Sequence, residues 1–211
     1  MNRKKIEMKV DCKSLNLIEI RNKLEIARKA SPIYITETGK SILQKASVLI
    51  PFVCVDGCWS LIYTRRSDSL KSHRGQVSFP GGGAEQTDQS PIDTALRETY
   101  EEIGIQNSGI HIIDNMPDFV TNSNYIVTPV VAWVDWPVPL SISHTEVSRV
   151  FTIPIDWLRD KTNWEERLYE FPNGLYGSVI FYNLYDGELL WGVSAKITVE
   201  LFSILGEKFI K

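Results

Sequence analysis

The 211-residue chain contains few cysteines, few histidines and no long apolar run. The three histidines are scattered and the cysteines are Cys12, Cys54 and Cys58, so the spacing offers no four-ligand zinc site. No apolar stretch approaches the ~20 residues that a membrane-spanning helix needs. The basic segment 1–11 lacks the apolar core of a signal peptide. We therefore expect a cytoplasmic protein with no membrane span, whose cysteines are reduced thiols.

A large excess of charge of either sign is also missing. The 23 Lys and Arg residues and the 26 Asp and Glu residues leave a formal net charge of -3, which argues against binding duplex DNA through a broad basic surface. Hydrophobic residues make up 43% of the chain and charged residues 23%, a composition typical of a folded domain. No repeat or long linker divides the sequence. We expect one domain at residues 46–211, preceded by an N-terminal helical extension at residues 1–45.

The spacing of apolar residues predicts the main helices and strands. Residues 14–30 are expected to form a helix that ends at Ser31-Pro32, and residues 194–205 a closing helix. Asp56-Gly57 is typical of a tight turn between two strands. Strands are expected at residues 46–55, 58–63, 109–113, 125–134, 147–153, 178–184 and 188–191. Because strands precede and follow a central helix, the pattern predicts an α/β fold with a mixed sheet and helices on both faces.

The central helix is predicted to begin after Ser90 and to end before Gly104. Ser90 is a suitable N-cap, Pro91 fits the first helical position, and Asp93 follows three residues after the cap, as in a capping box. Gly104 suits the residue that stops a helix. The residues that recur at helical spacing and define the expected buried face are Ile92, Ala95, Leu96, Thr99 and Ile103.

Three glutamates of this helix, Glu98, Glu101 and Glu102, are predicted to share another face. Like charges three and four residues apart destabilise an isolated helix by about 0.3 kcal/mol per pair. Two of the three also lie in the half of the helix where the dipole disfavours negative charge. A divalent cation such as Mg²⁺ or Mn²⁺, which prefers clustered oxygen ligands, would relieve this repulsion. The alternative interpretation is a solvated acidic surface.

A glycine run at residues 79–83, Phe-Pro-Gly-Gly-Gly, precedes the helix. Glycines let the backbone approach an ion or a phosphate closely. Together with this run, the helix resembles the Nudix box, G-x5-E-x7-R-E-U-x-E-E-x-G-U, in which U is aliphatic. The residues that carry the resemblance are Gly83, Arg97-Glu98, Glu101-Glu102 and Gly104-Ile105.

The chain departs from the box at two positions. Gln89 stands where the box has its first Glu, and Thr99 replaces an aliphatic residue. The first departure puts in doubt an interaction that supports the helix, because the three clustered glutamates remain.

The resemblance to the Nudix family implies an α/β/α sandwich that hydrolyses diphosphates linked to another moiety with Mg²⁺ or Mn²⁺. It implies that Glu98 and Glu102 are metal ligands and that Glu101 is a ligand or a base. The carbonyl of Gly82 is a further candidate ligand. Arg97 would orient the carboxylates through charge-assisted hydrogen bonds.

The segment upstream of the glycine run resembles the extra motif of coenzyme A pyrophosphatases, L-L-T-x-R-S-x3-R-x3-G-x3-F-P-G-G. Residues 61–67 match its start, Gly75 and residues 79–82 match its end, and Lys71 takes the place of the second Arg. Lys71 keeps the charge but lacks the bidentate fork of arginine. Segments 146–154 and 190–195 also resemble this subgroup. The resemblance implies hydrolysis of coenzyme A or its derivatives to 3′,5′-ADP and 4′-phosphopantetheine.

Four basic residues, Arg65, Arg66, Lys71 and Arg74, lie within ten residues of an otherwise acidic chain. Coenzyme A carries a diphosphate bridge and a 3′-phosphate, so we expect these residues to bind the phosphates of the substrate. The alternative is that some of them are solvated surface residues. The cluster is short and lacks interleaved aromatic residues, so we expect no nucleic-acid partner.

Several alternatives stay open at this point. Glu146 is a second candidate for the general base, or else a surface residue of a loop. A second alternative concerns the substrate. If the pocket differs from that of coenzyme A pyrophosphatases, the substrate would be another nucleotide, such as ADP-ribose, a dinucleotide or a nucleoside triphosphate. A third alternative is that the protein is a non-catalytic Nudix ligand sensor, although a sensor would not need three metal-binding carboxylates. The N-terminal helix is a candidate contact for a partner or for a homodimer.

Overall fold

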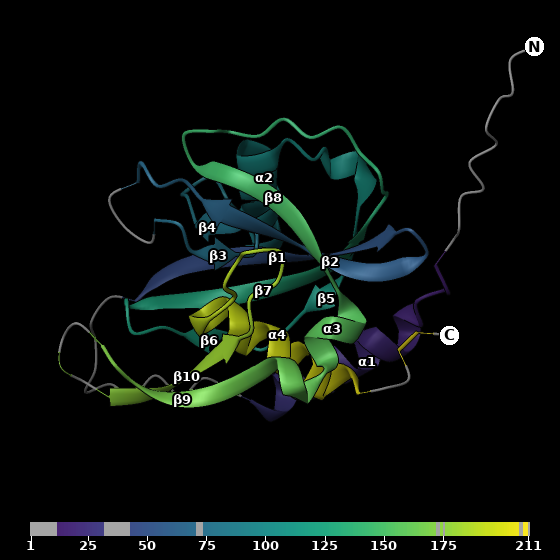
Figure 1. Ribbon diagram of the computed structural model, residues 1–211. Helices are drawn as coiled ribbons and strands as arrows, with labels where there is room; N and C mark the ends of the chain where they lie inside the picture. The colour runs from purple at the N-terminus through teal and green to yellow at the C-terminus, as the bar shows by residue number, and fades with distance from the viewer. Residues whose placement is uncertain are drawn as a thin grey trace, which may run out of the picture.

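The computed structural model describes residues 12–31, 43–70, 74–171, 174, 176–206 and 209–210. It contains a mixed eight-stranded sheet with helices on both faces and a separate two-stranded sheet (Figure 1). The helices are α1 (Leu17–Ala30), α2 (Pro91–Ile103), α3 (Ile155–Arg159) and α4 (Gly192–Leu205), with short 3₁₀ helices η2 (Asn107–Gly109) and η3 (Lys161–Asn163). The strands are β1 (Gln44–Val55), β2 (Cys58–Arg66), β3 (Val77–Ser78), β4 (Gly81–Gly83), β5 (Ile110–Asn115), β6 (Phe119–Val120), β7 (Tyr125–Val134), β8 (Val147–Pro154), β9 (Trp164–Glu170) and β10 (Tyr176–Tyr182). The expected α/β sandwich is confirmed.

Strand β1 lies at the centre of the large sheet and changes partners along its length. It runs parallel to β7, while its first half pairs antiparallel with β4 and its second half pairs antiparallel with β2. Strand β2 in turn pairs with β8 along one side and with β3 near its end. The sheet therefore divides where β1 and β2 part, and the glycine strand β4 lies beside that division.

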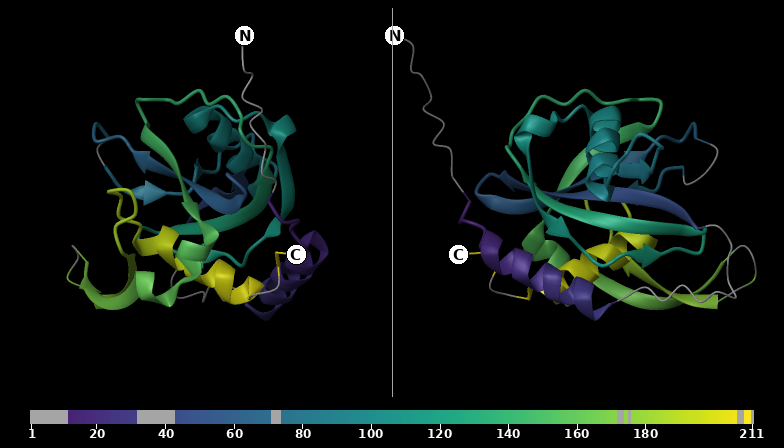
Figure 2. Two further views of the ribbon diagram at one scale, coloured as in Figure 1. Left: turned by 45° about the vertical axis from the view of Figure 1, so that its right-hand side comes forward. Right: turned by 180° about the vertical axis from the view of Figure 1, so that it is seen from behind.

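The sheet separates two hydrophobic layers. Helix α2 covers one face, and α1, α3 and α4 cover the other (Figure 2). Neighbouring residues of β1 alternate between the layers: Leu49 packs on the α2 side, and Ile50 joins the cluster that includes α1 and α4. On β2, Ile62 belongs to the α2 side and Tyr63 to the opposite side. This alternation determines which side chains of β2 can reach α2, the helix that carries Glu98, Glu101 and Glu102.

Most of the predicted elements are present, with boundaries shifted by a few residues. The turn at Asp56-Gly57 is confirmed, because both residues have positive φ angles (48° and 80°) between β1 and β2. The strand expected at residues 188–191 is wrong, since this segment makes only isolated bridges, Tyr185 with Glu188 and Phe181 with Trp191. Strand β9 was not expected, because its side chains are mostly exposed and charged and its sequence lacks an apolar alternation.

Helix α1 packs directly on the core of the domain. Ile20 and Leu24 are fully buried in the cluster that also contains α4. The Lys23 ammonium donates a hydrogen bond to the carbonyl of Leu205 at 2.7 Å, and the backbone N–H of Asn16 donates to the carbonyl of Phe209 at 2.8 Å. We propose that residues 1–45 are an extension of the domain at residues 46–211. Helix α1 of this extension completes the hydrophobic core of the domain.

The cysteines differ from the expectation of three reduced thiols. Cys12 and Cys54 form a disulfide, and Cys58 is a free, exposed cysteine. The pairing joins positions 42 residues apart, with 5.7 Å between their Cα atoms. Cys54 and Cys58 are close in the sequence, but they are not the bonded pair. The disulfide joins β1 to the chain that precedes α1.

Neither of the longest helices among the described residues could cross a membrane, since α1 and α4 have 14 residues each and no described helix is both long and apolar enough to do so.

We expect reduction of the disulfide to lower the free energy of unfolding. For a bridge that spans 42 residues, the chain-entropy relation gives about 4 kcal/mol. Denaturant unfolding with and without dithiothreitol measures the loss. Cys58→Ser should respond to the reductant like the unmodified protein, whereas Cys54→Ser should show no response. A response of Cys54→Ser equal to that of the unmodified protein would contradict the assignment.

Candidate active site

The ends of α2 are fixed by the residues that the sequence pointed to. The Ser90 hydroxyl accepts a hydrogen bond from the backbone N–H of Asp93 at 3.3 Å and donates to its carboxylate at 2.9 Å. Pro91 is the first helical residue, and Gly104 closes the helix in the left-handed conformation with φ 74°. These caps set the rotation of the helix and therefore the direction of each glutamate.

The three glutamates were predicted to share a face apart from the buried one, but they lie at three depths. Glu102 is buried, with an exposed fraction of 2%, Glu98 is half-buried and Glu101 is exposed. Glu102 lies on the face that also buries Thr99 and Ile103. The Thr99 hydroxyl is satisfied by donating to the carbonyl of Ala95 at 2.6 Å, so the departure from an aliphatic residue costs little.

The glycine strand β4 lies directly against the two inner glutamates. The backbone N–H of Gly81 donates to Glu102 Oε2 at 3.3 Å. A Cβ atom at Gly82 would lie 2.5 Å from the carboxylate of Glu98, so no other residue fits there without a shift. A Cβ atom at Gly81 would lie 2.3 Å from the carbonyl oxygen of Ser47, so Gly81 and Gly82 are the two glycines that allow the backbone of β4 to lie this close to its neighbours.

Burial raises the pKa of both inner carboxylates, although each has an arginine beside it. Desolvation raises the pKa of Glu102 to about 8, while the N–H of Gly81 and the guanidinium of Arg66 oppose the shift. Desolvation also raises the pKa of Glu98 above its ordinary value, against the effect of Arg97. Two carboxylates that resist ionisation beside each other form a site that a cation would stabilise.

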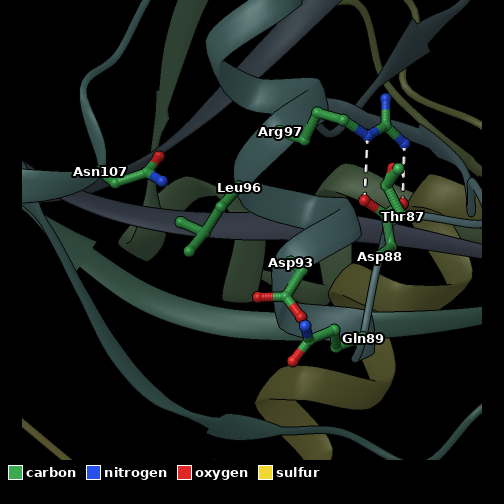
Figure 3. Close-up of a pocket in the computed structure, with 7 residues that line it drawn as sticks. All are labelled: Thr87, Asp88, Gln89, Asp93, Leu96, Arg97 and Asn107. Atoms are coloured by element: carbon green, nitrogen blue, oxygen red, sulfur yellow. Dashed lines mark hydrogen bonds and ion pairs between the residues drawn. The ribbon is translucent and has the colours of Figure 1, made fainter.

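Arg97 is held mainly by Asp88, a residue that the motif comparison missed. The guanidinium of Arg97 donates to Asp88 through Nε and Nη2 at 3.2 and 3.0 Å, and Nη1 donates to Glu98 and Glu101 at 3.0 and 2.9 Å. The hydrogen bonds from Arg97 lower the pKa of Asp88 to about 2. Gln89 lies beside Asp93, away from Arg97 (Figure 3).

The supporting carboxylate is therefore present one residue earlier than expected. The spacing of the box from Gly83 places its first acidic position at Gln89. The carboxylate that binds Arg97 belongs instead to Asp88. Asp88 is further fixed by the hydroxyl of Thr94 at 3.0 Å and the N–H of Glu85 at 2.9 Å. The sequence contains this carboxylate, since Asp88 directly precedes the box position at Gln89.

The basic cluster divides between the two faces of the sheet. The Arg66 guanidinium reaches Glu102 Oε1 at 3.8 Å on the α2 side. Arg65 points to the opposite side, where it pairs with Asp68 at 3.0 Å and Glu188 at 3.5 Å. Arg74 is exposed, and Lys71 lies outside the described residues. The structure thus brings one of the predicted phosphate-binding residues, Arg66, to the acidic helix.

Glu146 lies in the turn directly before β8 and is exposed. Its carbonyl accepts a hydrogen bond from the N–H of Ser67 at 2.7 Å, which ties this loop to the end of β2. The negative charge of Glu146 contributes to the raised pKa of both Glu98 and Glu102. Glu146 thus contributes to the electrostatics of the inner glutamates.

The donors around Glu98 and Glu102 fit a hard divalent cation by their chemistry. They are carboxylate oxygens beside a backbone that only glycine allows. Among the described residues, no three acidic, histidine or cysteine side chains already converge on one point. Glu98 and Glu101 both accept hydrogen bonds from Nη1 of Arg97, at 3.0 and 2.9 Å.

A pocket lies beside α2. Arg97 and Asp88 line it, and the dashed lines in Figure 3 mark the interactions between them. The other residues that line it are Thr87, Gln89, Asp93, Leu96 and Asn107.

We expect Asp88→Asn to lower the free energy of unfolding by roughly 2 kcal/mol, because it breaks a bidentate ion pair whose carboxylate is 6% exposed. Gln89→Ala serves as the matched control and should change it by less than about 0.5 kcal/mol. Urea denaturation at neutral pH measures both variants. Equal effects of the two substitutions would show that Asp88 is not the partner that fixes Arg97.

Glu102→Gln tests the raised pKa of the buried carboxylate. In the unfolded chain Glu102 ionises near its ordinary pKa of 4.5, but in the folded metal-free protein it ionises near 8. The free energy of unfolding should therefore fall as the pH rises from about 4.5 to 8, by on the order of 4 kcal/mol. In EDTA, Glu102→Gln should match the unmodified protein at pH 5 and exceed it at pH 9. A difference that does not vary with pH would contradict the burial of this charge.

Comparison with known proteins identifies the family. The NUDIX domain matches residues 44–172. The uncharacterized Nudix hydrolase NudL of Yersinia pestis (strain Pestoides F) is 36% identical over 154 residues, which cover 73% of this chain and 76% of that protein. NudL of Yersinia pseudotuberculosis serotype O:1b (strain IP 31758) gives the same figures. A MutT/nudix family protein from Enterococcus faecalis shares the fold, with a TM-score of 0.52 at 14% identity over 92% of this chain and 81% of that chain. The chain belongs to the Nudix hydrolase family.

Proposed function

We propose that this Nudix hydrolase cleaves the diphosphate bond of coenzyme A or its derivatives, with Mg²⁺ or Mn²⁺ as cofactor. The observation that carries the proposal is the buried carboxylate of Glu102, which lies beside Glu98 and the glycine strand with Arg66 at 3.8 Å. This arrangement offers oxygen ligands for a cation and a guanidinium for a phosphate within one site.

In this proposal Glu98 and Glu102 hold the cation, with Glu101 and the carbonyl of Gly82 as further ligands. A bound divalent cation supplies neutralisation of the charge on the non-bridging phosphate oxygens and lowers the pKa of bound water. Arg97 keeps the carboxylate of Glu98 in place through a hydrogen bond at 3.0 Å. The site residues of the chain thus position the reacting groups before the bond is broken.

The chemical step is the attack of water on one phosphorus of the diphosphate. A bond forms between that phosphorus and the water oxygen, the bond to the bridging oxygen breaks, and the bridging oxygen leaves with the second phosphate. The proton of the water passes to a general base, for which Glu101 and Glu146 are the candidates. Both are exposed at the edge of the site and can exchange that proton with solvent.

Coenzyme A as the substrate is supported by the segment that links β2 to the glycine strand. Residues 61–82 resemble the extra motif of coenzyme A pyrophosphatases, and they supply both Arg66 and Gly82 to the site. Arg74 and Lys71 belong to the same segment and are proposed to meet the 3′-phosphate. Arg65 is proposed to stabilise the segment through Asp68 rather than to bind substrate directly.

We also propose a small-molecule partner rather than nucleic acid or a membrane, and a cytoplasmic location. The reducing cytoplasm would hold Cys12 and Cys54 as thiols, so this location implies that the protein works without its disulfide there.

Product analysis on a panel of nucleotides tests the substrate. We expect coenzyme A, with Mg²⁺ or Mn²⁺, to yield 3′,5′-ADP and 4′-phosphopantetheine by mass spectrometry. ADP-ribose, NADH and dNTPs should be cleaved with a kcat/KM lower by at least about tenfold, which corresponds to about 1.4 kcal/mol of transition-state binding. Dephospho-coenzyme A separates recognition of the 3′-phosphate from that of the diphosphate. Intact coenzyme A beside cleaved ADP-ribose would overturn the proposed substrate.

A further inference from the structure

Arg66 stands apart from the other basic residues because it faces the acidic helix. It follows Ile62 and Thr64 on the α2 side of β2, whereas Arg65 follows Tyr63 on the opposite side. The described residues give the guanidinium of Arg66 one ionic partner, Glu102 Oε1 at 3.8 Å.

The hydrogen-bonding capacity of Arg66 is largely unused. A guanidinium has five N–H donors, yet the Nε atom of Arg66 is buried and has no acceptor. The distance of 3.8 Å to Glu102 is an ion pair rather than a hydrogen bond. Leaving buried donors unpaired is costly, so this side chain is arranged for an acceptor that the protein alone does not supply.

We propose that Arg66 is the counter-charge of Glu102 in the metal-free protein, and that its charge weakens metal binding until the diphosphate of the substrate engages the guanidinium. The inference rests on the proposed function, which takes Glu102 as a metal ligand and names a diphosphate as the acceptor. Arg66 is thus a positioning residue that couples metal binding to substrate binding.

The direction of the coupling follows from the signs of the charges. A divalent cation held by Glu102 would stand near the positive guanidinium, and repulsion between them lowers the affinity for the metal. Removing Arg66 also favours a proton on Glu102, which competes with the metal. A proton carries one positive charge and Mg²⁺ carries two, so the relief of repulsion is greater for the metal and its affinity still rises.

An anion on Arg66 has the same effect as removing its charge. When phosphate oxygens accept from the guanidinium, its field at Glu102 is neutralised and the metal binds more tightly. Because binding free energies are reciprocal, bound metal must tighten the binding of the substrate by the same factor. The site would therefore fill with metal mainly when substrate is present.

Titration of Mg²⁺ alone into the metal-free, full-length protein tests the proposal by calorimetry. Arg66→Gln should bind Mg²⁺ roughly three- to tenfold more tightly than the unmodified protein, a range reduced by solvent screening of a partly exposed pair. Arg66→Lys retains the charge and should bind Mg²⁺ as the unmodified protein does. Arg65→Gln removes the same charge from the opposite side of the sheet and should change the affinity by less than twofold.

Three results would overturn the proposal. Weaker Mg²⁺ binding by Arg66→Gln would show that Arg66 positions Glu102 for the metal. Unchanged binding would show that the charge is not felt at the site. Equal tightening by Arg65→Gln and Arg66→Gln would indicate a general field of the surface. If Arg66→Gln does not fold, Arg66→Lys and Arg65→Gln still test the proposal. A changed Mg²⁺ affinity in Arg66→Lys, which keeps the charge, together with an unchanged affinity in Arg65→Gln would contradict a role for the charge of Arg66.

The test does not depend on the identity of the substrate. Mg²⁺ binding is measured without any nucleotide, so a failure to cleave coenzyme A leaves its result intact. The kinetic consequence is separate: Arg66→Gln should raise KM for the cleaved nucleotide while it lowers the Kd for Mg²⁺. Changes of opposite sign distinguish coupling from simple damage to the site, which would weaken both.

Discussion

The buried carboxylate of Glu102 is the constraint on which the rest of the site depends. Its exposed fraction is 2%, its nearest positive group is 3.8 Å away, and its pKa is raised to about 8. Burying a carboxylate without a close counter-charge is costly for stability. This cost is what the proposed cation site on α2 would offset.

The scaffold holds that carboxylate by fixing what surrounds it. The division of the sheet between β1 and β2 leaves room for the glycine strand β4, whose backbone meets Glu98 and Glu102. Asp88 and Arg97 secure the other side of α2 through a bidentate ion pair. Helix α1, α3 and α4 lie behind the sheet and complete the core, away from the acidic helix (Figure 2).

Local signals in the sequence predicted the main helices and most of the long strands, but not β9. The caps of α2 and the turn at Asp56-Gly57 depend on neighbouring residues, and both are confirmed. Non-local features were not predictable. The depth of Glu102 depends on how β4 packs, the separation of Arg65 from Arg66 depends on the pleat of β2, and the Cys12–Cys54 bridge joins distant segments. Asp88 was missed because a fixed motif spacing directed attention to its neighbour.

Anomalous diffraction from crystals soaked in Mn²⁺ tests the central claim most directly, since it locates the metal without reference to any substrate. The account predicts an anomalous peak within coordinating distance, about 2.2 Å, of carboxylate oxygens of both Glu98 and Glu102. Glu98→Gln with Glu102→Gln should remove the peak. A peak elsewhere on the molecule, with Glu102 still held by the N–H of Gly81 and by Arg66, would contradict the account.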